Sequence, residues 1–132
     1  MTKTGPKVTV AKVGDPGALS FTSCTVCKLC RTGHPAYCTS FTKLNTGGVP
    51  GCIQHGDCTI FGKYFGHSSF GNYALVEETS VVNLQGIVQS AEELQIFAPL
   101  GCGFQTGVGT ITNLSGAGPS DSVVIMGLGA VG

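Results

Sequence analysis

The chain has 132 residues, enough for one domain with a core of its own. Seven basic residues balance seven acidic ones, so the chain lacks the net positive charge that nucleic acid or an anionic membrane surface attracts. No run reaches the roughly 18 apolar residues of a membrane helix, and residues 1–7 lack the apolar core of a signal peptide. We therefore expect a cytoplasmic protein with no nucleic-acid or membrane partner.

The first half of the chain is expected to be rich in β-structure and loops. Val8–Phe21 contains alternating valines and, at residues 14–17, a Gly-Asp-Pro-Gly turn, which together indicate the entry to a β-hairpin. Residues 24–38 show little hydrophobic periodicity and are expected to form a lobe that something other than an apolar face holds in order. The Gly-, Thr- and Asn-rich stretch Thr39–Gly62 is predicted to be a loop, and Phe70–Leu84 returns to strand composition.

A helix and a buried strand are expected in the second half. Ser90 and Glu93 match a capping box, which predicts a short helix that ends before Pro99. Gly101–Leu114 combines several glycines with β-branched residues, and propensity alone predicts a loop or a strand. The apolar run Ser122–Met126 is typical of a buried parallel strand.

Seven cysteines in a reducing compartment indicate metal binding or catalysis rather than disulfides. Four of them follow the spacing Cys-x2-Cys-x2-Cys-x7-Cys, and four thiolates without a water position describe a structural zinc site. Lys28 and Arg31 lie among them, and their charge is expected to lower the thiol pKa values. An iron–sulfur cluster is the chemical alternative. The four candidate ligands are Cys24, Cys27, Cys30 and Cys38.

Several segments resemble the zinc-dependent medium-chain alcohol dehydrogenases, and in particular their aryl- and benzyl-alcohol branch. Ser23–Cys38 is similar to the structural-zinc lobe of that family, and Val13–Asp15 to the turn that precedes the lobe. Phe65–Ala74 resembles the family's Phe-Gly-x-Ser-Ser-Phe-Ala strand, and Leu100–Gly107 the segment that provides one cysteine ligand of the catalytic zinc. The resemblance covers essentially the whole chain and implies an internal fragment of such an enzyme.

The resemblance assigns roles to the second half of the chain. It makes Cys102 a ligand of the catalytic zinc and Thr106 a neighbour of the nicotinamide ring, on a segment that is helical in the family. The run Gly127–Gly132 is a G-x-G-x-x-G pattern directly after the expected strand, where a dinucleotide pyrophosphate approaches the backbone. The cofactor-binding candidates are Thr106, Gly127, Gly129, Val131 and Gly132.

The implied fold is mostly β with some α. Residues 1–115 resemble part of a GroES-like β-barrel catalytic domain, with the zinc lobe at 24–38, and residues 116–132 the start of a Rossmann domain. Intact members of the family are homo-oligomers that oxidise alcohols to aldehydes with NAD(P). The resemblance implies that the substrate is a primary alcohol, with aryl alcohols as candidates. The family's other catalytic-zinc ligands, a cysteine and the histidine of a Gly-His-Glu segment, have no counterpart, so we expect no turnover from these 132 residues alone. The alternative is a non-catalytic zinc-binding module that docks on a partner protein.

Two further groups have both a functional and a structural interpretation. Cys52, His55 and Cys58 match a second metal-binding pattern, but no closed ligand set is evident, and we favour ordinary loop residues. Three aromatic side chains fall near positions that line the family's substrate pocket, although aromatic residues beside strands more often belong to the core. They are Phe21, Tyr64 and Phe65.

Overall fold

The computed structural model describes the backbone of residues 1–132 and all side chains except those of residues 51 and 52. The chain divides into two compact units, Met1–Gln85 and Gly86–Gly132, which are described separately. No helix among the described residues is long and apolar enough to cross a membrane.

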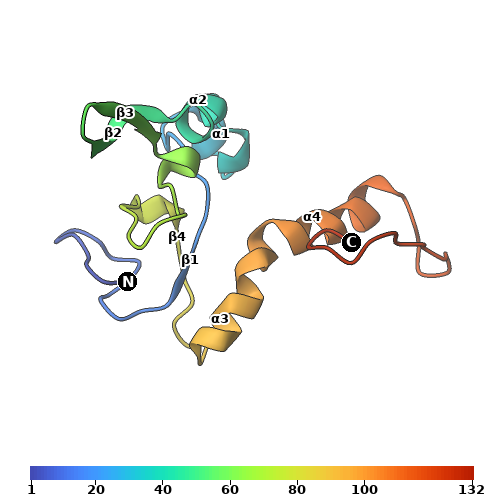
Figure 1. Ribbon diagram of the computed structural model, residues 1–132. Helices are drawn as coiled ribbons and strands as arrows, with labels where there is room; N and C mark the ends of the chain where they lie inside the picture. Colours follow the sequence, from blue (N-terminus) through green and yellow to red (C-terminus); the bar gives the residue numbers. More distant parts are fainter. The chain divides into compact units, whose positions relative to one another are not determined.

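The central sheet of the first unit joins two distant segments. Strand β1 (Gly17–Leu19) pairs antiparallel with β4 (Val81–Asn83), with Ala18 opposite Val82 (Figure 1). The expected hairpin entry in residues 8–21 is therefore wrong, although the turn before β1 forms, with Gly14 at φ 98°. The reason is that the Glu78 carboxylate accepts hydrogen bonds from the N–H groups of Thr9 and Val10, so a side chain takes the place of a neighbouring strand.

The lobe that contains the four cysteines consists of short helical turns. Helix α1 (Lys28–Arg31) and the 3-10 turn η1 (Pro35–Tyr37) are followed by α2 (Phe41–Asn45). Helices this short do not persist in water by themselves. None of the three turns buries an apolar side chain, which agrees with the missing hydrophobic periodicity.

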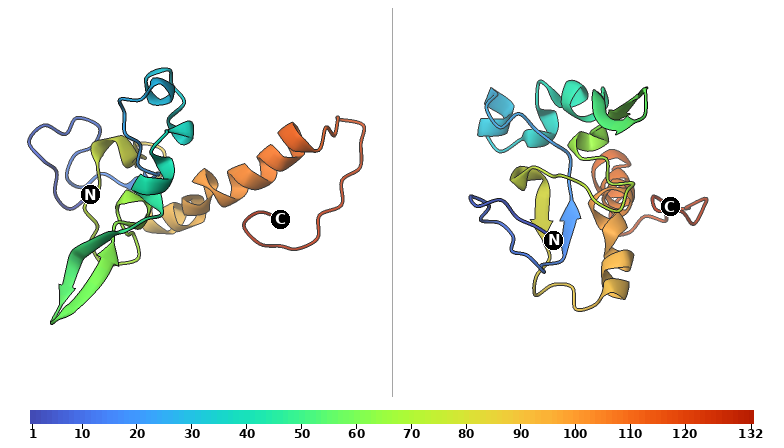
Figure 2. Two further views of the ribbon diagram at one scale, coloured as in Figure 1. Left: turned by 90° about the horizontal axis from the view of Figure 1, so that it is seen from above. Right: turned by 60° about the vertical axis from the view of Figure 1, so that its left-hand side comes forward.

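The predicted loop of residues 39–62 is wrong beyond α2, because a β-hairpin forms there. Strands β2 (Val49–His55) and β3 (Cys58–Gly62) pair antiparallel, with an irregularity in register between Pro50 and Ile53, and form the long pair of green arrows in Figure 2. The turn residues are Gly56 and Asp57, and Gly56 has φ 58°. A Gly-Asp pair between two β-rich runs is a recognised hairpin signal, which the surrounding glycines obscured.

The rest of the first unit is mainly irregular. Two 3-10 turns, η2 (Tyr64–Gly66) and η3 (Glu78–Ser80), flank a stretch without regular structure, so only β4 fulfils the strand expectation for residues 70–84. Phe70 and Leu75 are exposed. Among the described side chains, those with no exposed surface are two polar ones, Asn45 and Ser80, so hydrogen bonding holds the centre of this unit together.

The second unit is helical. Helix α3 (Ala91–Phe97) starts as the capping box predicts, since the Ser90 hydroxyl accepts the Glu93 N–H at 3.2 Å, and it leads into the 3-10 turn η4 (Ala98–Gly101). The carboxylate of Glu93 accepts the N–H of Gln89, one residue earlier than the standard capping box.

Helix α4 (Gly103–Gly109) and the π-helical turn η5 (Thr110–Leu114) replace the loop or strand that propensity predicts, and agree with the helix that the family resemblance implies. Side-chain hydroxyls support the backbone here: Thr110 donates to the carbonyl of Thr106 at 2.8 Å, and Ser115 donates to that of Ile111 at 2.7 Å. Tertiary packing also overrides propensity, as the contacts of the α4 glycines below show.

The buried parallel strand expected at residues 122–126 is absent. These residues have no regular structure, and Met126 is 94 % exposed. A parallel strand receives its hydrogen bonds from neighbouring strands, and none of the described residues pairs with this run. Within the described backbone the strands form two two-stranded sheets and no closed barrel.

Gly66 is predicted to be intolerant of a side chain. It has φ 81°, and an added Cβ would overlap the Thr22 hydroxyl and lie 2.7 Å from Thr22 Cβ. We expect Gly66→Ala to lower the free energy of unfolding by about 2–4 kcal/mol, the sum of the left-handed backbone cost and the overlap. Urea unfolding followed by circular dichroism measures this loss.

Gly56→Ala is the matched control, because Gly56 has φ 58° and nothing within 4 Å of its added Cβ. Only the backbone cost applies there, about 1 kcal/mol. Equal losses for the two variants would show that Thr22 does not pack closely against Gly66.

Candidate metal centre

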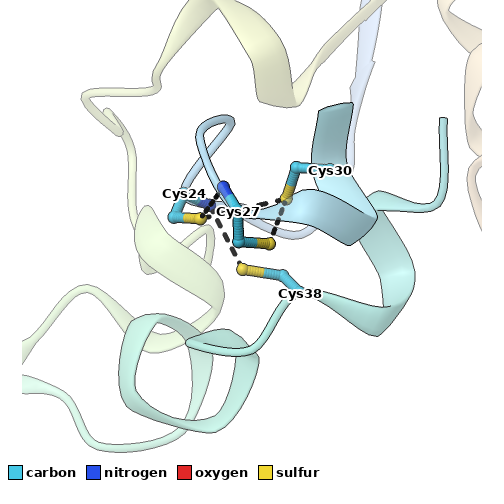
Figure 3. Close-up of side chains that lie close together, drawn as sticks. All are labelled: Cys24, Cys27, Cys30 and Cys38. Atoms are coloured by element: carbon cyan, nitrogen blue, oxygen red, sulfur yellow. Dashed lines mark hydrogen bonds between the residues drawn. The ribbon is translucent and has the colours of Figure 1, made fainter. Parts of the chain in front are cut away.

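The four cysteines of the lobe converge on one point. The sulfur atoms of Cys24, Cys27, Cys30 and Cys38 all lie within 4.8 Å of one another (Figure 3). Cys24 Sγ lies 4.0 Å and Cys27 Sγ 3.4 Å from Cys30 Sγ. Zinc–sulfur bonds of about 2.3 Å in a tetrahedron place sulfur atoms about 3.8 Å apart, so these separations fit a single tetrahedral ion.

Local backbone geometry aims the thiols inward. Thr25 adopts φ 61° between the first two ligands, and the N–H of Cys27 donates to Cys24 Sγ at 3.3 Å. Helix α1 begins directly after Cys27 and carries Cys30 back to the same side. Because such donors favour negatively charged sulfur, the backbone prepares the site for thiolates.

The fourth ligand closes the site. Cys38 is buried, with 5 % of its surface exposed, and its sulfur accepts the N–H groups of Cys24 and Ser40, each at 3.4 Å. The other three ligands are half-buried. The donor set contains only thiols, with no position left for a water, so the residues fit a structural zinc ion.

The pKa values of the thiols follow from these contacts. The N–H of Cys30 and then that of Thr39 lower the pKa of Cys27 to about 6. The N–H groups of Cys24 and Ser40 also lower the pKa of Cys38. Burial, and then the thiol of Cys27, raise the pKa of Cys30 to about 11. Metal binding must therefore displace a proton from Cys30.

The expected source of the lowered pKa values was wrong. Lys28 and Arg31 are exposed, and the main causes of the lowered thiol pKa values are backbone N–H groups. A bent backbone places a donor in direct contact with sulfur, whereas a flexible cationic side chain in water is screened. Turn geometry, which residue types alone do not show, is thus what tunes the site.

The candidates in the second unit lie around α4. Cys102 is exposed and precedes the helix, and the N–H of Thr106 donates to the Cys102 carbonyl at 2.8 Å, one helical turn away. Residues four apart lie on one helix face, so these two positions share a side of α4. Among the described side chains, Cys102 belongs to no group of three or more metal-ligating residues.

The glycine-rich run lies against the same helix. An added Cβ on Gly103 would lie 2.6 Å from Ala130 Cβ, and one on Gly107 would overlap the carbonyl of Val131. The absence of side chains on α4 thus allows residues 130–131 to approach its backbone. The structure brings the run Gly127–Gly132, with its candidates Gly127, Gly129, Val131 and Gly132, next to the helix of Thr106 without forming a regular element there.

The remaining candidates form no further metal site. The side chain of Cys52 lies outside the described residues. His55 and Cys58 are paired at the end of the hairpin and are exposed. The metal-ligand group found among the described side chains consists of the four cysteines of the lobe and does not include them.

The three aromatic candidates form two ring pairs. Phe21 packs on Phe41 with ring centroids 5.3 Å apart, and Tyr64 packs on Phe65 at 5.1 Å. Tyr64 is 57 % exposed, whereas Phe21 is half-buried. The Phe21 ring therefore has the packing role that aromatic residues beside strands usually have, and Tyr64 is the more accessible of the three.

Zinc analysis tests the lobe directly. We expect one zinc ion per chain, with four of the seven thiols protected from a thiol reagent until a chelator is added. Elemental analysis combined with thiol titration makes both measurements. Two zinc ions per chain would indicate that Cys102 or the Cys52 hairpin also binds metal, and bound iron would replace the zinc assignment.

Alkylation of the metal-free chain tests the pKa pattern. Since the thiolate is the nucleophile and the pKa of Cys27 is lowered to about 6, its rate of reaction with iodoacetamide should rise to half its maximum near pH 6. Cys30, with its pKa raised to about 11, should remain mostly unmodified at neutral pH. Peptide mass mapping across pH resolves the two sites, and faster labelling of Cys30 than of Cys27 would contradict the pattern.

No family model matches the chain. The curated relatives it matches include geraniol dehydrogenase from Castellaniella defragrans, 39 % identical over 133 aligned positions, and a probable alcohol dehydrogenase from a Pseudomonas species, 35 % identical over 132. Each match covers 97 % of this chain, which spans 35 % and 41 % of the length of the two relatives. The chain thus corresponds to little more than a third of these proteins.

Two crystal structures resemble it. Benzyl alcohol dehydrogenase from Acinetobacter calcoaceticus is 38 % identical, with a TM-score of 0.71 over 97 % of this chain and 34 % of that one. An alcohol dehydrogenase zinc-binding domain protein from Burkholderia ambifaria is 34 % identical, with a TM-score of 0.67 over 85 % and 30 %. These matches show that alcohol dehydrogenases are homologues of this chain, and one of them is named for a zinc-binding domain.

Proposed function

We propose that this chain supplies part of an NAD(P)-dependent alcohol dehydrogenase that oxidises a primary alcohol to an aldehyde. The observation that carries the proposal is similarity to dehydrogenases over 97 % of the chain, including enzymes named for geraniol and benzyl alcohol. Both of these substrates are primary alcohols with an unsaturated group beside the carbinol carbon. An aryl or allylic alcohol is therefore the substrate class that we propose.

The proposed roles of the residues follow the two units. Cys24, Cys27, Cys30 and Cys38 hold the structural zinc. Cys102 would offer its exposed sulfur to the catalytic zinc, and Thr106, one turn further along the same face, would contact the nicotinamide. The backbone of Gly127–Gly132 approaches the cofactor pyrophosphate. A zinc ion bound there would supply Lewis-acid chemistry, and a bound nicotinamide cofactor would supply the hydride acceptor.

We further propose that residues 1–115 belong to a GroES-like catalytic domain and residues 116–132 to the start of a Rossmann domain. A cytoplasmic location and assembly into a homo-oligomer, as in intact relatives, are part of the same proposal. The alternative of a docking module without catalysis finds no support, because the relatives described above are named as dehydrogenases.

A chimera tests the proposal. The matching third of the Acinetobacter calcoaceticus benzyl alcohol dehydrogenase is replaced by these 132 residues, and benzyl-alcohol-dependent NAD(P)H formation is followed spectroscopically. We expect activity, and we expect Cys102→Ser to lower kcat/KM by about 10³-fold or more, because it removes a ligand of the Lewis-acid zinc. The 132 residues by themselves should give no turnover.

Cys58→Ser is the matched control, since Cys58 is an exposed thiol on β3 and should leave kcat/KM unchanged. A folded chimera that retains its zinc but fails to oxidise alcohol would contradict the proposal. Equal effects of the two cysteine substitutions would contradict the role given to Cys102.

A further inference from the structure

The segment that leads into the cysteine lobe, Ser20–Thr22, is held by hydrogen bonds to backbone and side-chain groups of residues later in the chain. The N–H of Ser20 donates to the carbonyl of Ser80 at 2.8 Å, and the Ser20 carbonyl lies 3.1 Å from Nε2 of His67. The Ser80 hydroxyl donates to the carbonyl of Phe21 at 3.0 Å and lies 3.3 Å from the hydroxyl of Thr22. The Ser20–Ser80 backbone bond lies directly beside the β1–β4 pairing, and polar side chains bond the backbone from there to Thr22.

Asn45 provides the tightest of these attachments. Its side chain has no exposed surface, and its Oδ1 accepts the N–H of Thr22 at 2.8 Å. Its Nδ2 donates to the carbonyls of Thr22 at 2.8 Å and of Phe41 at 2.9 Å. One amide therefore pairs both backbone groups of Thr22, as an adjacent strand would, and uses its two N–H donors and its oxygen.

This attachment joins the two ends of the metal lobe, Ser20–Thr22 before the ligands and Asn45 after them, and we call this junction the neck of the lobe. Thr22 lies two residues before Cys24, and α2, which ends with Asn45, begins three residues after Cys38. All four metal ligands therefore lie in the loop that the Thr22–Asn45 bonds close. The Phe21–Phe41 ring pair lies at the same neck, with centroids 5.3 Å apart.

We propose that Asn45 is a positioning residue that couples metal binding at the four cysteines to the conformation of Ser20–Thr22 and thereby to the placement of Phe21. The metal ion and the Asn45 amide close the same loop. If metal binding comes first, it bears most of the entropic cost of closing the loop, and the Asn45–Thr22 bonds then form at a lower cost. The reverse order has the same effect, so each interaction favours the other. Linkage makes this coupling reciprocal: the factor by which the amide tightens metal binding equals the factor by which the metal stabilises the neck.

This coupling requires only the lobe and its neck, and it is independent of alcohol oxidation. Removing the Asn45 side chain takes away the partners that it gives to the N–H and carbonyl of Thr22, which are part-buried. The neck then opens more readily, and the metal must bear the cost of loop closure alone. Supporting residues of metal sites typically change affinity by about 10- to 100-fold, and we expect a loss in that range.

The experiment uses zinc and the full 132-residue chain. Zinc affinity is measured by competition with a chelator for the unsubstituted chain and for Asn45→Ala, Asn45→Asp and Asn113→Ala. The aspartate keeps an acceptor for the Thr22 N–H and loses both donors, so its affinity should fall between those of the unsubstituted chain and the alanine variant. Asn113 is an exposed asparagine of the second unit and serves as the control with unchanged affinity.

Amide hydrogen exchange gives a readout that general destabilisation would not reproduce. In the unsubstituted chain, zinc should slow exchange of the Thr22 amide by the same factor by which Asn45 strengthens zinc binding. In the zinc-loaded Asn45→Asp variant, which keeps the acceptor, this amide should stay protected, whereas in Asn45→Ala it should exchange fast with or without zinc. The amide of Glu93 at the start of α3 should exchange alike in all variants.

Zinc affinities of Asn45→Ala and Asn45→Asp within threefold of the unsubstituted chain would overturn the proposal. A Thr22 amide whose exchange does not respond to zinc in the unsubstituted chain would overturn it as well, and this result needs no variant to fold.

Discussion

The convergence of four cysteine sulfurs on one point is the constraint on which the first unit depends. Apolar burial contributes little there: among the described side chains, Ala11 and Cys38 are the apolar side chains buried in this unit, and Asn45 and Ser80 are more completely enclosed. A segment that buries so little apolar surface needs another source of order. A metal held by the four thiolates would provide it, because its binding energy becomes folding energy when the site does not exist in the unfolded chain.

In the second unit, glycine residues determine how closely two segments approach each other. The glycines of α4 make it a weak helix by propensity, and their contacts with Ala130 and Val131 show what the weakness permits. A larger residue at either position would strengthen the helix and separate it from the glycine-rich run. The two glycines therefore favour close approach over the intrinsic stability of the helix.

What could be predicted from the sequence was local. The cysteine spacing indicates a metal site because adjacent ligands need only a tight turn, and the pair Ser90 and Glu93 predicts the start of α3 because capping is decided within one turn. The β-hairpin at Gly56 and Asp57 was also within reach, since its turn residues are a known signal. The pairing of β1 with β4 was not, because it depends on a segment far along the chain. The strand expected at residues 122–126 failed for a related reason, since a strand exists only with a partner.

The roles of Asn45 and Ser80 were beyond sequence reasoning as well. An asparagine at the end of a short helix is commonplace, and its importance lies in contacts with a residue 23 positions earlier. At α4 the propensity-based prediction was wrong, and the resemblance to a known family predicted the helix. A family resemblance includes the effect of tertiary packing, which the propensities of single residues do not.

The closed neck also bears on the order in which the chain folds during synthesis. Thr22 and Asn45 are 23 residues apart, so the ligands, the ring pair and the amide are all available as soon as α2 has been made. Strand β1 must wait for β4, near the far end of the first unit. Contacts close in sequence form faster than distant ones, because less loop entropy is lost. The lobe is therefore able to capture its metal while the rest of the unit is still unpaired, and the captured lobe then presents Ser20–Thr22 in an ordered form to the later segments that contain His67 and Ser80.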